Sequence, residues 1–138
     1  MPDFFDTVKL QHYVTPFFQE LGPVLNHGRY YFQYVVRCYV ENGGGLTPKE
    51  LLRRTGLRYG KTPENIAGCI QRFVRGVCLK EGMEDYADRW RELGWDGETA
   101  LTPSYFIPLV CRGFYPYVKR HHPKEYKELK KLFPPPKD

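Results

Sequence analysis

The chain lacks the long apolar run that a membrane span requires. Among its 138 residues, no stretch approaches the roughly 20 consecutive apolar residues that cross a bilayer. Its first residues, MPDFFDTVKLQ, also lack the basic-then-apolar order of a secretory signal peptide. The sequence therefore predicts a cytoplasmic protein without a membrane partner.

Closely spaced metal ligands are missing as well. The four cysteines stand far apart among apolar neighbours: Cys38, Cys69, Cys78 and Cys111. Zinc ribbons and redox motifs need close pairs, so we expect buried free thiols instead. His121 and His122 are adjacent, and on a helix such side chains diverge by about 100°, which is poor for chelation. We expect no metal and no cofactor.

No catalytic constellation is visible in the sequence. No serine, cysteine or carboxylate has a base or partner at a diagnostic spacing. Residues 81–98 hold seven acidic side chains against two arginines, but Glu84, Asp88 and Glu92 repeat every four residues along a predicted helix that already has an apolar stripe. Such a repeat favours a solvated helix face over a metal or acid–base site. We therefore predict that the protein is not an enzyme.

What the sequence does contain suits one compact all-α domain. A hydrophobic fraction of 41% with 27% charged residues is typical of a single globular core, and 16% aromatic residues predict a bulky one. Residues 29–41 are rich in β-branched and aromatic side chains, which also suit a strand. We predict a helix there because the pattern does not alternate and the run exceeds ordinary strand length.

Four Thr-Pro pairs mark predicted helix starts. A threonine hydroxyl accepts from early helical N–H groups, and proline pre-sets the backbone of the first helical residue. The pairs lie at 15–16, 47–48, 62–63 and 102–103. At the first pair we also expect Pro16 to interrupt any helix formed by residues 3–14.

The predicted organisation has three parts. Residues 1–16 form an N-terminal arm or short helix, residues 17–118 form a helical domain, and residues 119–138 form a basic C-terminal extension. Within the extension, residues 123–133 are basic and amphipathic, and the three prolines at 134–136 must be extended. Either a DNA contact or a solubilising tail fits this composition.

Residues 47–80 carry the strongest functional signal. A helix from Pro48, a turn and a recognition helix of about 63–80 give the outline of a helix-turn-helix. The stretch holds eight Lys or Arg residues against two Glu, an excess larger than the +5 of the whole chain. A local excess of this kind is typical of a DNA-binding face, although two helices joined by a turn are also common in all-α proteins. The apolar stripe of the second helix is Ile66, Cys69, Ile70, Phe73, Val74 and Val77.

The polar side of that helix supplies the predicted DNA-binding residues. Asn65 and Gln71 suit adenine edges, while Lys61, Arg72 and Arg75 suit phosphates. Double-stranded DNA, read in its major groove, is therefore the predicted partner. The complete predicted set is Lys61, Thr62, Glu64, Asn65, Gly68, Gln71, Arg72 and Arg75.

The order of several short stretches resembles a known family. They are Glu20–Pro23 followed by Gly28 and Tyr30 or Tyr31, then Tyr59–Pro63, Ile66 and Ile70, and Leu101–Ile107. In this order, residues 17–118 resemble the C-terminal DNA-binding effector domain of the stage-zero sporulation transcription factor A family, a response-regulator domain that follows a phosphorylatable receiver. The resemblance implies a sequence-specific transcription regulator that pairs as a homodimer on DNA through the helix at about 103–118. We also expect contact with another regulator or with RNA polymerase.

The chain departs from that family where the family reads DNA. After the Thr-Pro pair the family has Ser-Arg-Val-Glu-Arg-Ala-Ile-Arg, and this chain has the residues Glu64–Gln71. Two arginines and a glutamate are replaced by Asn65, Gly68 and Ala67. Because a bidentate Arg–guanine contact supplies roughly 1–3 kcal/mol of discrimination, we expect a different target sequence. Residues 1–16 are also too few for a receiver domain, so we do not expect gating by phosphorylation.

Two functions remain open at this point. The first is a DNA-binding transcriptional regulator with an altered target. The second is a non-enzymatic protein-interaction module that keeps the scaffold, has lost specific DNA reading, and binds a partner through an aromatic surface of Tyr115, Tyr117 and Tyr126.

Overall fold

The computed structural model describes residues 4–136, and all regular structure within that range is helical. The predicted all-α class is therefore confirmed, including a helix where residues 29–41 also suited a strand. The first three residues of the predicted arm lie outside the described range. The helices are α1 (Phe4–Leu21), α2 (Gly28–Glu41), α3 (Pro48–Tyr59), α4 (Pro63–Cys78), α5 (Glu84–Leu93), α6 (Pro103–His121) and α7 (Pro123–Leu132).

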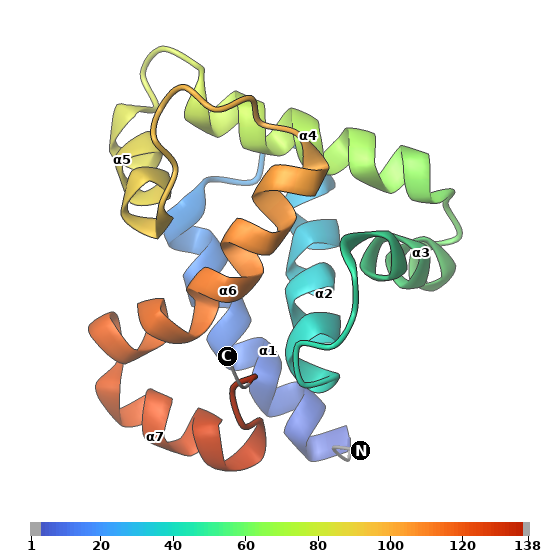
Figure 1. Cartoon of the computed structure of the whole chain (residues 1–138), viewed down its shortest axis with the longest axis vertical. Helices are drawn as coiled ribbons and strands as arrows, with labels where there is room; N and C mark the ends of the chain where they lie inside the picture. The colour runs from blue at the N-terminus through green and yellow to red at the C-terminus, as the bar shows by residue number, and fades with distance from the viewer. Residues whose placement is uncertain (1–3, 137–138) are drawn as a thin grey trace.

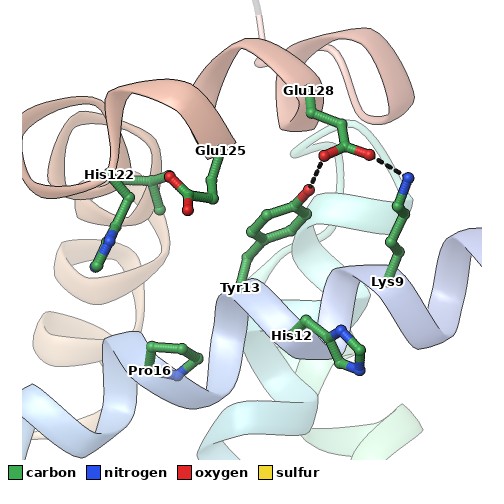
Figure 2. Close-up of a pocket in the computed structure, with 8 residues that line it drawn as sticks. Lys9, His12, Tyr13, Pro16, His122, Glu125 and Glu128 are labelled. Carbon is green, nitrogen blue, oxygen red and sulfur yellow. Dashed lines mark hydrogen bonds and ion pairs between the residues drawn. The ribbon is translucent and has the colours of Figure 1, made fainter.

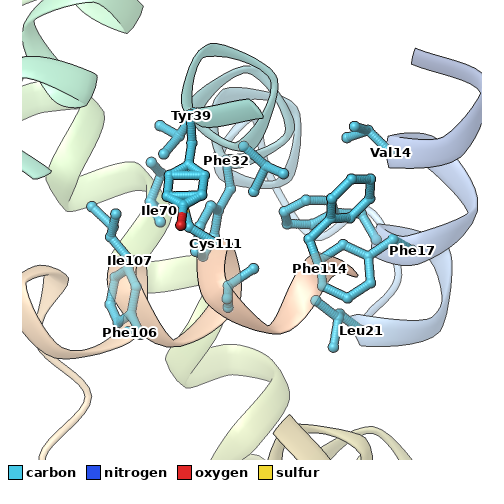
Figure 3. Packing of buried hydrophobic residues seen from close by; sticks show 14 of the residues in the cluster. Val14, Phe17, Leu21, Phe32, Tyr39, Ile70, Phe106, Ile107, Cys111 and Phe114 are labelled. Atoms are coloured by element: carbon cyan, nitrogen blue, oxygen red, sulfur yellow. The ribbon is translucent and has the colours of Figure 1, made fainter. Parts of the chain in front are cut away.

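Aromatic rings of α1, α2 and α6 form the centre of the core (Figure 3). The ring of Phe17 meets that of Phe114 edge-on, with centroids 5.3 Å apart, and Phe32 lies 5.6 Å from Phe106. All four side chains are essentially inaccessible to solvent. Such aromatic pairs contribute about 0.5–1.5 kcal/mol each beyond the burial of their area. These three helices form the frame on which the others pack.

α1 is one continuous helix, so the prediction that Pro16 interrupts it is wrong. A proline inside a helix removes one hydrogen bond and crowds the preceding turn. Here Val14 and Phe17, on either side of Pro16, are both buried in the core, and tertiary packing overrides the local preference. The Thr15 hydroxyl accepts from Gln11 Nε2 at 2.8 Å within the same helix and caps nothing.

The other three predicted helix starts are confirmed. Thr47 Oγ1 accepts from the backbone N–H of Glu50 at 3.2 Å, and Thr62 Oγ1 accepts from that of Asn65 at 3.1 Å. Thr102 precedes α6, but its side chain makes no capping bond. The two helices of the predicted helix-turn-helix thus begin at Pro48 and Pro63.

The C-terminal part packs onto the core. α6 continues past Gly113 and Pro116, and the division predicted at residue 118 falls inside it. α7 then folds back so that Leu129 and Phe133 are buried. The Tyr115 hydroxyl donates to the Phe133 carbonyl at 2.6 Å, which fixes the end of α7 against α6.

α4 lies across the N-terminal end of α2 (Figure 1). The backbones approach so closely that a Cβ at Gly28 would lie 2.1 Å from the Cys69 carbonyl oxygen. Only glycine fits there. The side of α4 that meets the core is completely buried at Ile66, Ile70, Phe73, Val74 and Val77.

Gly28→Ala should therefore destabilise the protein by about 1–3 kcal/mol, the usual cost of overpacking, because the opposing atom belongs to the backbone. Gly68→Ala is the matched control, since a Cβ there meets nothing closer than Arg72 Nη1 at 3.7 Å. Alanine at Gly68 should be neutral or should stabilise α4 by up to about 1 kcal/mol. Urea unfolding followed by circular dichroism measures both, and a Gly28→Ala midpoint equal to wild type would contradict the close approach.

Candidate nucleic-acid interface

The outward side of α4 carries polar and basic side chains. Asn65, Arg72 and Arg75 are exposed on the side opposite the buried stripe, and half-buried Gly68 lies among them. We call these four residues the α4 face. Glu64 is also exposed, in the first turn of the helix, where its charge complements the helix dipole.

The connection from α3 into α4 is short and closed by close backbone contact. Gly60 has a φ of +67°, a conformation that favours glycine, and Lys61 N–H donates to the Gly56 carbonyl at 2.9 Å. A Cβ at Gly56 would lie 2.4 Å from the Lys61 carbonyl oxygen, so this position also requires glycine. The turn leaves Lys61 and Thr62 exposed at the start of α4.

A line of contacts orders the α4 face. Cys69 Sγ lies 3.8 Å from Asn65 Oδ1, and Arg72 Nη2 donates to Cys69 Sγ at 3.2 Å. Cys69 is only half-buried, so the prediction of a buried thiol is wrong there, because the residue lies at the edge of the stripe, three and four residues from its polar neighbours. The other three cysteines are buried free thiols as predicted: Cys38, Cys78 and Cys111.

Gln71 lies differently from the other predicted residues. Its side chain is half-buried, and Nε2 donates to the Leu101 carbonyl at 3.0 Å. Leu101 belongs to the connection 94–102, which runs beside the C-terminal half of α4 (Figure 1). The Asp96 carboxylate orders this connection by accepting from the Thr99 backbone N–H at 2.6 Å and the Thr99 hydroxyl at 2.7 Å, and these bonds lower the pKa of Asp96 to about 2. The Gln71 amide therefore ties α4 to the connection instead of projecting freely outward.

Gln71→Ala should lower the free energy of unfolding by about 1 kcal/mol, the usual net contribution of one hydrogen bond. Arg75→Ala, on the exposed side of the same helix, should change it by less than about 0.5 kcal/mol. Urea denaturation of the two variants against wild type provides the comparison. A Gln71→Ala protein as stable as Arg75→Ala would show that the bond to Leu101 contributes nothing.

Basic side chains surround the α3–α4 pair. Arg53 Nη2 forms an ion pair with Glu50 Oε2 at 3.0 Å on the surface of α3. The acidic helix α5, with Glu84 and Asp88 exposed as predicted, lies at the other end of α4 from α3 (Figure 1). Positive charge therefore gathers toward the α3 end. The exposed Lys and Arg residues of the pair and its flanks are Lys49, Arg53, Arg58, Lys61, Arg72, Arg75 and Lys80.

A separate hollow of about 430 Å³ lies between α1 and the last two helices (Figure 2). Glu128 of α7 forms an ion pair with Lys9 and accepts from the Tyr13 hydroxyl at 2.9 Å. Burial and this bond raise the pKa of Tyr13 to about 12. These contacts join α7 to α1. Among the residues described, no group of three or more His, Cys, Asp or Glu side chains converges on a metal position.

The aromatic surface predicted for a protein partner is not formed. Tyr115 and Tyr117 are 6% and 4% exposed, because α6 is surrounded by other helices along most of its length. Burial raises the pKa of Tyr115 well above its ordinary value. Tyr126 is half-buried, with Lys130 Nζ 4.8 Å from its ring centroid. The prediction is wrong for the first two tyrosines.

In the part of the chain that the structure covers, no helix combines the length and the apolar character needed to cross a bilayer. Comparison of the chain with protein-family models, with curated proteins and with solved structures gave no match.

Proposed function

We propose that the protein is a DNA-binding transcriptional regulator that places α4 in the major groove. The observation that carries the proposal is the division of α4 into a completely buried side and an exposed side bearing Asn65, Arg72 and Arg75. The major groove, about 12 Å wide, admits an α-helix and presents base edges to its outward side chains. The Asn65 amide can donate to and accept from a base edge, and the guanidinium groups of Arg72 and Arg75 can donate to phosphates beside the groove.

The N-terminal half of α4 is the part that enters the groove in this proposal. The connection 94–102 flanks the other half, and recognition helices read bases chiefly with their N-terminal residues. Asn65 suits the N6 and N7 edge of adenine, and Glu64 suits the amino group of cytosine. Gly68 has no side chain and permits close approach of the helix backbone to DNA.

Lys61, Arg72 and Arg75 supply phosphate contacts. All three are exposed, and among the described residues none forms an ion pair. Each phosphate that a cation neutralises releases counterions, so the logarithm of affinity falls with the logarithm of salt concentration by about 0.9 per contact. Thr62 has a different role, because its hydroxyl already caps α4.

The resemblance to sporulation-regulator effector domains supports the same placement of the recognition helix. A different operator follows, since Asn65 and Gly68 stand where that family has arginine. Pairing of copies through α6, and contact with another regulator or with RNA polymerase, remain predictions. A dimer through α6 would use the residues it leaves exposed: Ser104, Arg112, Pro116, Lys119, Arg120 and His121.

A protein-interaction module is the second candidate, and exposed apolar side chains favour it. Leu79, at the C-terminal end of α4, is 61% exposed, and Val24 and Leu25 are 49% and 40% exposed. The Leu25 side chain lies beside Gly76 of α4, three residues before Leu79. Exposed apolar side chains suit a protein partner better than phosphates.

Binding to non-specific duplex DNA should weaken steeply with salt. Replacing both Arg72 and Arg75 with alanine should reduce the salt slope by about 2 and weaken binding to all sequences alike, because two phosphate contacts are lost. The matched control replaces Lys124 and Lys127, exposed on α7, and removes the same charge. Fluorescence anisotropy of a labelled duplex across a salt series measures the slopes, and equal slopes for the two double variants would count against α4 as the binding element.

Asn65→Ala tests base reading separately from charge. Selection of bound sites from a random duplex pool should yield a preferred sequence for the wild type. The Asn65→Ala protein should lose preference at one base pair, by about 1–3 kcal/mol of discrimination, with an unchanged salt slope. Identical selected sequences for the two proteins would contradict the proposed role of Asn65.

A further inference from the structure

A smaller hollow lies among α1, α2 and the end of α3. Its volume of about 170 Å³ is below the roughly 300 Å³ of ordinary small-molecule pockets, so it suits one ring system and not a whole cofactor. We call it the Gln33 pocket. Its lining comprises Gln11, Tyr30, Gln33, Tyr34, Arg37 and Tyr59.

Tyrosine rings form its walls. The rings of Tyr34 and Tyr59 meet at 83° with centroids 5.9 Å apart. Tyr31 packs against Tyr59 at 4.8 Å and holds that ring in place. Tyr59 and Tyr30 are 40% and 47% exposed, so a planar group entering from solvent can stack on either.

Gln33 supplies a buried acceptor without a partner. The residue is 6% exposed, and its Oε1 makes no hydrogen bond with any residue in the described range. Its Nε2 reaches Thr15 Oγ1 at 3.5 Å. A buried carbonyl oxygen left unpaired is costly, and a ligand that presents an N–H group relieves that cost.

Two arginines decide the charge of the occupant. The guanidinium carbons of Arg37 and Arg58 lie 5.2 and 5.9 Å from the centre of the Tyr34 ring. Glu41 Oε1 lies 3.4 Å from Arg37 Nε and partly neutralises that arginine, whereas Arg58 is exposed. Tyrosines alone would suit a quaternary ammonium group, but these cations repel it and favour an anion.

We propose that the Gln33 pocket binds the base of a nucleotide. The base stacks on Tyr30 or Tyr59, its phosphate lies at Arg37 and Arg58, and the buried Gln33 amide turns toward the pocket that it lines so that Oε1 accepts an N–H of the base. A base that is paired within a duplex cannot enter such a pocket, because its faces and its Watson–Crick edge are occupied. The occupant is therefore a free nucleotide or an unpaired nucleotide of a strand.

Binding at the Gln33 pocket is separate from DNA binding by α4. No residue of the α4 face lines the Gln33 pocket. Mononucleotides lack a groove, so their binding reports on the pocket alone. The protein with both Arg72 and Arg75 replaced should bind mononucleotides as wild type does, even where it has lost duplex binding.

The test measures binding of the full chain to the four common mononucleotides by calorimetry and to a labelled mixed-sequence single strand by anisotropy. Gln33→Leu removes the buried amide at similar volume, and Tyr30→Ala removes an exposed ring. Each should weaken binding about tenfold, the usual order for loss of one stacking or hydrogen-bonding contact to a base. Unfolding midpoints of both variants establish that they fold.

Tyr126→Ala is the matched control. Tyr126 also lies between cations, with Lys119 and Lys130 nitrogens 5.8 and 4.8 Å from its ring, but it belongs to α7. Its replacement should leave binding unchanged.

Both supporting outcomes require that Gln33→Leu and Tyr30→Ala weaken the binding. If mononucleotides bind, the occupant is a free nucleotide. If only the single strand binds, the occupant is an unpaired nucleotide of a strand. Absence of binding to both probes overturns the proposal. Wild-type affinity in the folded Gln33→Leu and Tyr30→Ala proteins overturns it equally.

Discussion

The close approach of α4 to the start of α2 is the contact on which the arrangement of this protein depends. Gly28 leaves room for the Cys69 carbonyl, and the apolar stripe of α4 can therefore pack against the core. Burial of each large apolar side chain contributes about 1.5–3 kcal/mol, so turning the helix about its axis by even one position, about 100°, would forfeit several such contributions. The outward orientation of Asn65 and Arg72 is thus a consequence of core packing.

Local signals were sufficient to predict the helices that begin at Pro48 and Pro63. Each start needs only a threonine hydroxyl and a proline a few residues from the N–H groups they serve. The same signal at Pro16 was misleading, because Val14 and Phe17 are buried on either side of it and α1 continues through the proline. No property of residues 15 and 16 alone reports that packing.

The candidate sites were predictable to the extent that they depend on one helix. Periodicity correctly places Asn65, Arg72 and Arg75 on the outward side of α4. Periodicity also places Gln71 beside them. It does not report that the carbonyl of Leu101, thirty residues later in the chain, accepts a hydrogen bond from the Gln71 amide. The Gln33 pocket was missed because three helices form it, although one amide within the apolar run of residues 29–41 was the available signal.

The closed turn between α3 and α4 relates the two proposed sites to each other. Because Gly56 admits the Lys61 carbonyl so closely, the end of α3, which carries Tyr59, and the start of α4 are held as one rigid unit. Exposed Arg58 and Lys61 belong to this unit, whereas the acidic helix α5 lies at the other end of α4 (Figure 1). A polyanion approaching the protein would be attracted more strongly to the first end than to the second. The positive charge of residues 47–80 therefore fits a nucleic-acid path that crosses the turn better than it fits a contact confined to α4.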